Sequence, residues 1–292
     1  MSTKGQKRPS KLPFSLFLKS ALVGTRFDDS SKYLRWMIGT KERWRHPELW
    51  ELYLEERQLP YVLRYLLRND SCCVDVGCHV GSFLSLVLKC APYGKHIAFE
   101  ASKVKSEWLK RRFPAVEIIP TAVADKAGTG IFEENVKLPG FSRLKVDGET
   151  TRGATDSEVE VCRLDDMLLD RKIDLLKLDI EGGELAALRG ALATIQKWQP
   201  AIIFECAPEF VLNKLNIKRA DLYEFLTITV KYRIYCFSDF LFQKGSMDFP
   251  EFQKCGLYPF RAFNFIALPH SRKVNAQLSG AGGENLDYRG FR

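Results

Sequence analysis

From about residue 70 onward, short apolar runs alternate with longer helical segments, and this alternation constrains the fold more than any other feature of the chain. The runs with the composition of β-strands are 72–76, 96–100, 116–120, 174–179, 201–206, 233–237 and 263–268. The earlier runs are almost continuously apolar, as in strands that are covered on both faces. The pattern therefore predicts an α/β fold: an open, seven-stranded, mostly parallel sheet with helices on both faces.

Outside these runs, the chain changes character in ways that suggest its organisation. Helical patterns separate the strand-like runs over 81–91, 105–113, 183–198 and 218–230. A polar stretch at about 125–165 predicts a hairpin or excursion at the rim of the sheet, where insertions often shape a substrate pocket. We expect four parts: a flexible basic segment over 1–27, an aromatic-rich helical cap over 28–69, the main domain over 70–270 and a flexible tail over 271–292.

The positive charge of the chain gathers near its start. The formal net charge is +8, and every charged residue before Asp28 is basic: Lys4, Lys7, Arg8, Lys11, Lys19 and Arg26. A solvated basic tail explains this best, while a patch for an anionic partner and an organellar transit peptide remain alternatives. No uninterrupted apolar run approaches the roughly 20 residues of a membrane helix, so we expect no transmembrane segment.

Eight cysteines raise the question of disulfide bonds or metal binding. Most of them lie inside strand-like apolar runs, where cysteine behaves as a small buried hydrophobic residue. Neither a C-x-x-C pair nor a histidine spacing suited to zinc accompanies them. The composition therefore predicts reduced thiols in a cytoplasmic protein, with organellar targeting by the basic N-terminus as the alternative.

The segment VDVGCHVGSF (74–83) has the order strand, glycine-rich turn, helix, which places a ligand at the carboxyl end of a strand. A dinucleotide fingerprint, G-x-G-x-x-G, requires a middle glycine that this turn lacks. A metal site is disfavoured because Cys78 and His79 are adjacent and their side chains diverge. His79 fits better as a residue that tolerates the positive φ such a turn often needs, with contact to a ligand as the alternative.

S-adenosylmethionine (SAM) is the third ligand that this turn could hold. SAM has no phosphates, so it needs close backbone approach at a glycine turn and acids nearby. Asp75 supplies an acid at the turn, and Glu100 ends the next strand, where an acid can accept hydrogen bonds from ribose hydroxyls. The two acids and the turn together favour SAM over a dinucleotide.

Several further blocks follow in order: FEA (99–101), AVAD (122–125), LDD (164–166), KLDIEGGE (177–184) with RGAL after it, and QPAIIFE (199–205). Together with DVGCHVG (75–81), they resemble the FkbM-type family of SAM-dependent methyltransferases over roughly residues 55–206. The chain departs from the usual family pattern at four positions, with Cys78 for Ala, His79 for Asn, Ala101 for Pro and Gly183 for Ala. All four exchanges are small or turn-tolerant.

The resemblance implies a Rossmann-like SAM-methyltransferase fold, with the cap at its N-terminal side and SAM as cofactor. The residues expected to bind the cofactor are Asp75, Gly77, Cys78, His79, Gly81, Glu100, Ala101, Ala122, Val123 and Asp125. Ala122 and Val123 are expected to flank the adenine, and Asp125 to lie near its amino group. Asp165 and Asp166 are interpreted as turn and capping residues.

The resemblance also implies methyl transfer, by in-line displacement, to a hydroxyl oxygen of a sugar, glycoconjugate or polyketide-like small molecule. A general base assists as the hydroxyl loses its proton. We expect Asp179 and Glu181 to be catalytic. Lys177 is either a catalytic group or an ion-pair partner, and Glu184 fits a helix cap. Three acids with His79 could bind a divalent metal, but we expect metal-independent chemistry.

Two other functions remain open at this stage. A nucleic-acid methyltransferase would suit the charge of +8, and a K-D-K-E set could be drawn from a lysine, Asp179, Lys197 and Glu205. Against it, Lys197 falls in a predicted helix, and no Asn-Pro-Pro-Tyr-like motif is present. A non-catalytic SAM-binding module is the second alternative. The sequence does not indicate an oligomeric state.

Overall fold

The computed structural model describes residues 21–25, 27–28, 36–37, 39–135, 142–145 and 154–272. The predictions for the basic segment up to residue 20 and for the tail beyond residue 272 lie outside the described residues. Within the described part of the chain, no helix has both the length and the apolar character that crossing a bilayer requires.

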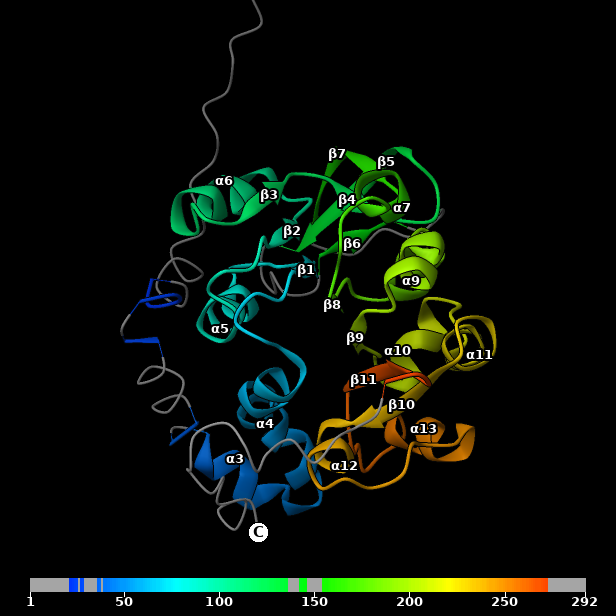
Figure 1. The fold of residues 1–292 in the computed structure, drawn as a ribbon. Coiled ribbons are helices and arrows are strands. Elements are labelled where there is room, and N and C mark those ends of the chain that lie inside the picture. The colour runs from blue at the N-terminus through cyan, green and yellow to red at the C-terminus, as the bar shows by residue number, and fades with distance from the viewer. Residues whose placement is uncertain are drawn as a thin grey trace, which may run out of the picture.

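One seven-stranded sheet organises the molecule, as predicted (Figure 1). Its strand order is β10-β11-β9-β8-β1-β2-β3. The strands are β1 (Cys73–Val76), β2 (Ile97–Phe99), β3 (Glu117–Ile119), β8 (Leu175–Leu178), β9 (Ala201–Glu205), β10 (Tyr232–Cys236) and β11 (Asn264–Pro269). Only β11 runs antiparallel to its neighbours β9 and β10, so the sheet is mostly parallel.

Helices cover both faces of the sheet. Figure 1 shows α4 (Trp50–Leu66) and α5 (Ser82–Cys90) on one side, and α9 (Leu192–Trp198) and α11 (Arg219–Glu224) on the other. One core cluster joins the sheet to α8 (Glu184–Arg189), α9, α11 and α13 (Phe249–Cys255), and a second joins it to α4, α5 and α12 (Phe237–Leu241). The remaining helices are α3 (Thr40–Arg45), η1 (Pro47–Leu49), α6 (Lys103–Arg112), α7 (Leu164–Leu168), α10 (Glu209–Lys214) and the π-helical turn η2 (Phe225–Thr229).

The segment predicted as one helix over 183–198 forms two, α8 and α9, with Gly190 between them. A Cβ at Gly190 would lie 2.2 Å from the carbonyl oxygen of Ala124, so glycine allows the end of α8 to approach the backbone of Ala124. Asp165 then caps α9, because its carboxylate accepts hydrogen bonds from the amides of Ala193 (3.1 Å) and Thr194 (2.8 Å). The predicted capping role of Asp165 is confirmed, although the helix it caps lies far along the chain.

The polar stretch at about 125–165 forms a second sheet, in the order β4-β7-β5-β6. Its strands are β4 (Ala122–Val123), β5 (Gly128–Asn135), β6 (Arg143–Leu144) and β7 (Ala154–Cys162). β5 and β7 pair antiparallel along their length, from Gly128 opposite Val161 to Asn135 opposite Ala154. The predicted hairpin is therefore confirmed.

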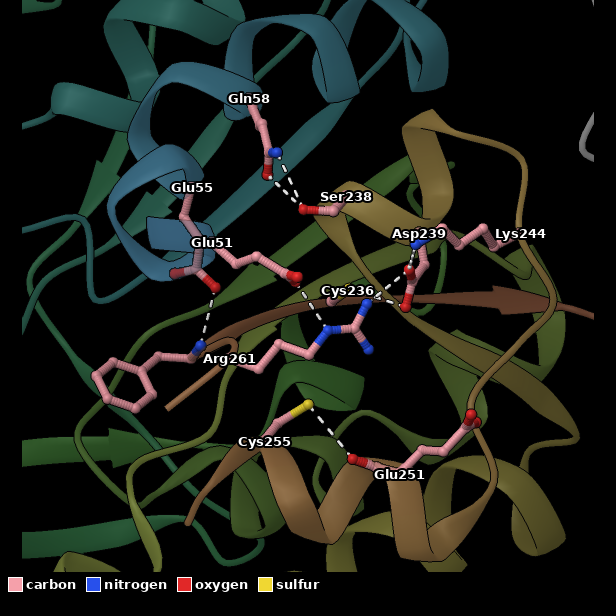
Figure 2. Close-up of polar contacts among 11 residues, drawn as sticks. Glu51, Glu55, Gln58, Cys236, Ser238, Asp239, Lys244, Glu251, Cys255 and Arg261 are labelled. Carbon is pink, nitrogen blue, oxygen red and sulfur yellow. Dashed lines mark hydrogen bonds and ion pairs between the residues drawn. The ribbon is translucent and has the colours of Figure 1, made fainter. Parts of the chain in front are cut away.

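Helix α4 of the predicted cap is fastened to the C-terminal part of the sheet. Figure 2 shows Glu51 of α4 directed toward Arg261 and Gln58 directed toward Ser238, with Glu55 between them along the helix. The buried carboxylate of Glu55 accepts three hydrogen bonds, one from the amide of Phe263 (2.8 Å) and two from Asn264, through its amide (3.0 Å) and its Nδ2 (2.8 Å). Glu51 accepts from Nε of Arg261 at 2.8 Å at the exposed rim.

We expect Glu55→Ala to lower the free energy of unfolding by about 3 kcal/mol, because it leaves buried N–H donors without an acceptor. Glu51, one turn earlier, is the matched control: its ion pair is half exposed, so Glu51→Ala costs less than about 1 kcal/mol. Urea denaturation followed by circular dichroism measures both. Equal losses for the two variants would contradict the role assigned to Glu55.

Candidate active site

A cavity of about 550 Å³ opens at the carboxyl ends of β1, β2 and β8. Gly77 and His79 follow β1, Glu100 follows β2, and the segment 179–183 follows β8. The second sheet contributes Phe132, Arg143 and Leu144, and the segment after α10 contributes Leu215, Asn216 and Ile217. This is the edge where open parallel sheets bind ligands, so the cavity is the candidate active site.

The turn after β1 depends on close backbone approach. Gly77 has φ +81°, and a Cβ there would lie 1.9 Å from the carbonyl oxygen of Asp179. The turns after β1 and β8 therefore contact each other through their backbones. His79 has φ +50°, which confirms the predicted left-handed position. Its side chain lines the cavity, and its Nε2 has no hydrogen-bond partner among the described residues.

Burial, followed by the charge of Lys105, lowers the pKa of His79 to about 4. The imidazole is therefore neutral at pH 7, when one of its nitrogens can accept a hydrogen bond and the other can donate.

Glu100 is buried where β2 ends, and it shapes the turn of β1. Its Oε2 accepts a hydrogen bond from the amide of His79 (2.8 Å), and its Oε1 accepts from the amide of Ser102 (2.9 Å). Burial raises the pKa of Glu100, and the charge of Lys105 opposes that rise. A carboxylate oxygen can accept more than one hydrogen bond, so Glu100 can also accept hydrogen bonds from the ribose hydroxyls of a nucleoside in the cavity.

Behind the cavity, a buried lysine joins two strands. Nζ of Lys177 on β8 lies 3.4 Å from Oδ1 of Asp75 on β1 and 3.0 Å from Oδ2 of Asp179. Burial alone would lower the pKa of Lys177, but the carboxylates of Asp179 and Asp75 outweigh it and raise the pKa above its ordinary value. Lys177 therefore stays charged, and its contacts are those of an ion-pair partner.

Two acids follow β8 into the cavity. Asp179 is 37% exposed there; burial alone would raise its pKa, but the ammonium of Lys177 reverses the shift and lowers it. The backbone of Glu181 has φ +55°, which is uncommon for a residue other than glycine. Strained backbone conformations of this kind often occur at functional sites. Burial and then the charge of Asp179 raise the pKa of Glu181 to about 8.

Glu184 supports this turn from α8. Its Oε1 accepts from the amide of Ile180 (2.9 Å), and its Oε2 accepts from the amide of Gly182 (3.0 Å). Both amides lie before α8, so Glu184 stabilises the turn that follows β8, whereas the sequence had predicted a helix cap.

Carboxylate oxygens of Asp179, Glu181 and Glu205 lie within 4.8 Å of one another, a spacing that a divalent cation can bridge. The ammonium of Lys177 already offsets part of this negative charge, so the geometry does not require a cation. Metal-independent chemistry stays a prediction.

The structure brings most of the predicted site residues to one cavity. Those that line it are Gly77, His79, Glu100, Ala101, Ala122, Val123, Asp125, Asp179 and Glu181. Asp75 and Lys177 lie behind it as the ion pair described above. Cys78 is buried in a core cluster, and Gly81 is the N-cap residue of α5, with φ +79° and the ring of Phe113 beside it, so both support the turn rather than line the cavity.

Some lining residues were not foreseen. Lys105 on α6 is buried and lines the cavity, and nothing in its sequence context distinguishes it from the other lysines of that basic helix. Arg143 lies in the polar stretch at about 125–165, which was predicted to be an insertion at the rim of the sheet. Because such insertions often shape a pocket, this stretch could have been searched for lining residues. Lys197, drawn into the K-D-K-E alternative, pairs with Asp170 at 3.1 Å and does not line this cavity.

The comparisons with known proteins agree with this arrangement. Residues 75–219 match the model of the Methyltransferase FkbM domain. The chain is 27% identical over 172 residues to Methyltransferase sdnD of Sordaria araneosa, a match that covers 44% of this chain and 66% of that protein.

Two solved structures are also similar. The FkbM methyltransferase of Methylobacillus flagellatus KT has a TM-score of 0.44 at 17% identity, with 69% of this chain and 44% of that one covered. The plantazolicin methyltransferase BpumL in complex with SAH has a TM-score of 0.38 at 13% identity, with 87% and 95% covered.

The sheet topology and the cavity at its carboxyl edge define a Rossmann-like, SAM-dependent methyltransferase fold. Within that class, the stretch from β1 to the start of α11 matches the FkbM methyltransferase domain, so this part of the chain is of the FkbM type. The chain spans about two thirds of the length of the Sordaria relative and less than half of the Methylobacillus chain.

We expect Gly77→Ala to lower the free energy of unfolding by about 3 kcal/mol and to abolish measurable SAM binding, because the added methyl group overlaps the Asp179 carbonyl at a positive φ. Gly245→Ala is the control, since a Cβ there meets nothing within 4 Å. Thermal unfolding and calorimetric titration with SAM measure the two effects. Normal SAM affinity in Gly77→Ala would show that this turn does not hold the cofactor.

Proposed function

We propose that this protein transfers the methyl group of SAM to a hydroxyl oxygen of a small molecule, in the class of sugars, glycoconjugates or polyketide-like compounds. One observation carries the proposal: Asp179, a carboxylate kept ionised by Lys177, lines the same cavity as the glycine turn expected to hold the cofactor. A base beside the methyl donor is what a hydroxyl acceptor requires.

The residues around the cavity fit the cofactor. Gly77 lines the cavity at the turn that packs against the backbone of Asp179, and Glu100 offers carboxylate oxygens for ribose hydroxyls. Ala122 and Val123 offer apolar surface for the adenine, with Asp125 beside them for its amino group. When bound, SAM supplies an electrophilic methyl group on a sulfonium.

The protein's own part in the reaction is alignment and proton removal. Holding two reactants in line supplies several kcal/mol of the barrier. Asp179 would accept the proton of the acceptor hydroxyl as the oxygen bonds to the methyl carbon and the bond from that carbon to the sulfonium sulfur breaks, which releases a neutral thioether. Glu181 is the second candidate base, because its pKa of about 8 lies near physiological pH.

The acceptor is expected to enter between the second sheet and the segment after α10. Arg143 and Leu144 line one side, and Leu215, Asn216 and Ile217 line the other, so the wall combines apolar surface with polar groups. Such a mixture suits a hydroxylated small molecule. A nucleic-acid acceptor has less support, because the K-D-K-E set is not assembled around the cavity.

We expect Asp179→Asn to reduce methyl transfer about 100-fold or more, since an amide cannot take the proton, while SAM affinity changes only a few-fold. Isotopically labelled SAM, incubated with a metabolite extract, identifies the acceptor and measures the loss. Asp170→Asn, at an exposed acid remote from the cavity, is the control. Label in RNase-sensitive material would favour the nucleic-acid alternative, and SAM binding without any labelled product would favour a non-catalytic module.

The pH dependence of transfer distinguishes the two bases. Since Lys177 holds the pKa of Asp179 below its usual value, a reaction that uses Asp179 is already at its plateau by pH 6, and Glu181→Gln leaves that plateau in place. A rate that rises through pH 8 in the wild type, and no longer does so in Glu181→Gln, would assign the base to Glu181 instead. Initial rates between pH 6 and 9 with the labelled acceptor make the measurement.

A further inference from the structure

A short segment near the N-terminus packs against the turn that follows β1, on the side away from the cavity. Its described residues, 22–25 and 27–28, are called the N-terminal clasp from here on. Within it, Val23 is 2% exposed and Asp28 is fully buried, whereas Leu22 is 40% exposed. The mechanism proposed above gives the clasp no part.

Hydrogen bonds fasten the clasp to α5 and α6. Nε of Arg112, the last residue of α6, donates to the carbonyl oxygen of Val23 at 2.6 Å, and its Nη2 donates to the same oxygen. The hydroxyl of Ser85 on α5 donates to Oδ2 of Asp28 at 2.5 Å, and the amide of Gly24 donates to that oxygen at 3.2 Å. Asp28 therefore joins the clasp to the helix that begins at the turn.

One aromatic ring lies between the clasp and the turn. A Cβ on Gly24 of the clasp would lie 2.9 Å from Cε1 of Phe113, the residue that follows α6. A Cβ on Gly81, the N-cap residue of α5, would lie 2.3 Å from Cε2 of the same ring. Cε1 and Cε2 are on opposite edges of the ring, so Phe113 contacts the clasp on one edge and the turn on the other.

The clasp also shares a hydrophobic cluster with the turn. Val23, Cys78, Val80 and Phe113 all belong to this cluster, whereas His79, between Cys78 and Val80, lines the cavity. One residue therefore separates the packed side of the turn from its cavity side. Because protein interiors are closely packed, trimming Val23 leaves a void into which its neighbours in the cluster relax, and His79 is displaced with them.

We propose that the N-terminal clasp holds the turn after β1 in the conformation that binds SAM, with Val23 and Asp28 as positioning residues. Neither side chain is among those that line the cavity, so their effect reaches the cofactor through Phe113 and the shared cluster. Coupling of this kind is reciprocal: a clasp that raises the affinity for SAM is stabilised by the same factor when SAM binds. The link to SAM rests on the proposed function, whereas the packing of the clasp against the turn does not.

Hydrogen exchange followed by NMR, on the full chain without SAM, tests the packing. The amide of His79 donates to Glu100, and the amide of Gly81 donates to the carbonyl oxygen of Cys78 at 2.7 Å, so both are protected while the turn is ordered. We expect Val23→Ala and Asp28→Ala to speed exchange at these two amides about tenfold, because local opening of the turn becomes easier. Unchanged exchange at the turn in both variants would overturn the proposal.

Two control variants separate this effect from a general loss of stability. Ile234→Val trims a fully buried side chain on β10, the edge strand at the far end of the sheet from β3. Leu22→Ala changes an exposed neighbour of Val23 that lies outside the shared cluster. Circular dichroism confirms that every variant is folded and gives its thermal midpoint. Exchange at the turn that is as fast in either control as in Val23→Ala would contradict the proposal.

Calorimetric titration with SAM tests the link to the cofactor. We expect Val23→Ala and Asp28→Ala to weaken SAM binding about tenfold, within the usual range for two coupled sites, while both controls bind as the wild type does. Turnover at saturating SAM in the labelled-SAM assay is expected to stay within about threefold of the wild type, because neither residue contacts the reacting atoms. Unchanged SAM affinity in both clasp variants would overturn the proposal.

The reciprocal measurement follows the clasp itself in the wild type. The amides of Gly24, Thr25 and Asp28 each donate a hydrogen bond within the clasp. Saturating SAM is expected to slow their exchange about tenfold, an effect that a merely structural segment would not show. Exchange in the clasp that is the same with and without SAM would contradict the coupling. A wild type that does not bind SAM would instead refute the proposed function, and with it the role of the clasp in cofactor binding.

Discussion

The candidate site depends on the buried ammonium of Lys177. It stands opposite Asp75 in the β1–β8 register and reaches Asp179 two residues further on, so a single cation links two central strands to the cavity. Without it, the carboxyl groups gathered at this edge would repel one another in a poorly solvated place. Gly77 completes the arrangement, since only a residue without a Cβ lets the turn of β1 lie against Asp179.

The helical cap contributes to the site indirectly. Glu55 of α4 holds the start of β11 through Phe263 and Asn264, and Asn264 stands opposite Glu205 in the sheet. The edge that carries Glu205 is therefore held by a helix distant in sequence. This connection gives the cap a physical reason to affect the acids beside the cavity, because a shift of β11 would move the strand end that bears Glu205.

Much of the fold could be predicted because its signals are local. Continuous apolar runs marked the strands of the central sheet, the polar interruption marked the second sheet, and the glycine-rich turn implied the positive φ of His79. The break between α8 and α9 was missed, because the reason for it is the carbonyl of Ala124, which approaches Gly190 from another part of the chain. Lys105 was missed for the same reason: its burial beside the cavity comes from packing.

By itself, the sequence determined the succession of strands and helices along the chain. It also determined the glycine turn with its acids and the blocks that mark an FkbM-type methyltransferase. Only the tertiary structure decided how the acids divide their roles. Lys177 contacts Asp75 and Asp179, Glu184 accepts hydrogen bonds from the turn before its own helix, and the carboxyl oxygens of Glu205 lie within 4.8 Å of those of Asp179. The protonation state of a carboxyl group depends on burial and on charges a few ångströms away, and those distances exist only once the sheet has formed.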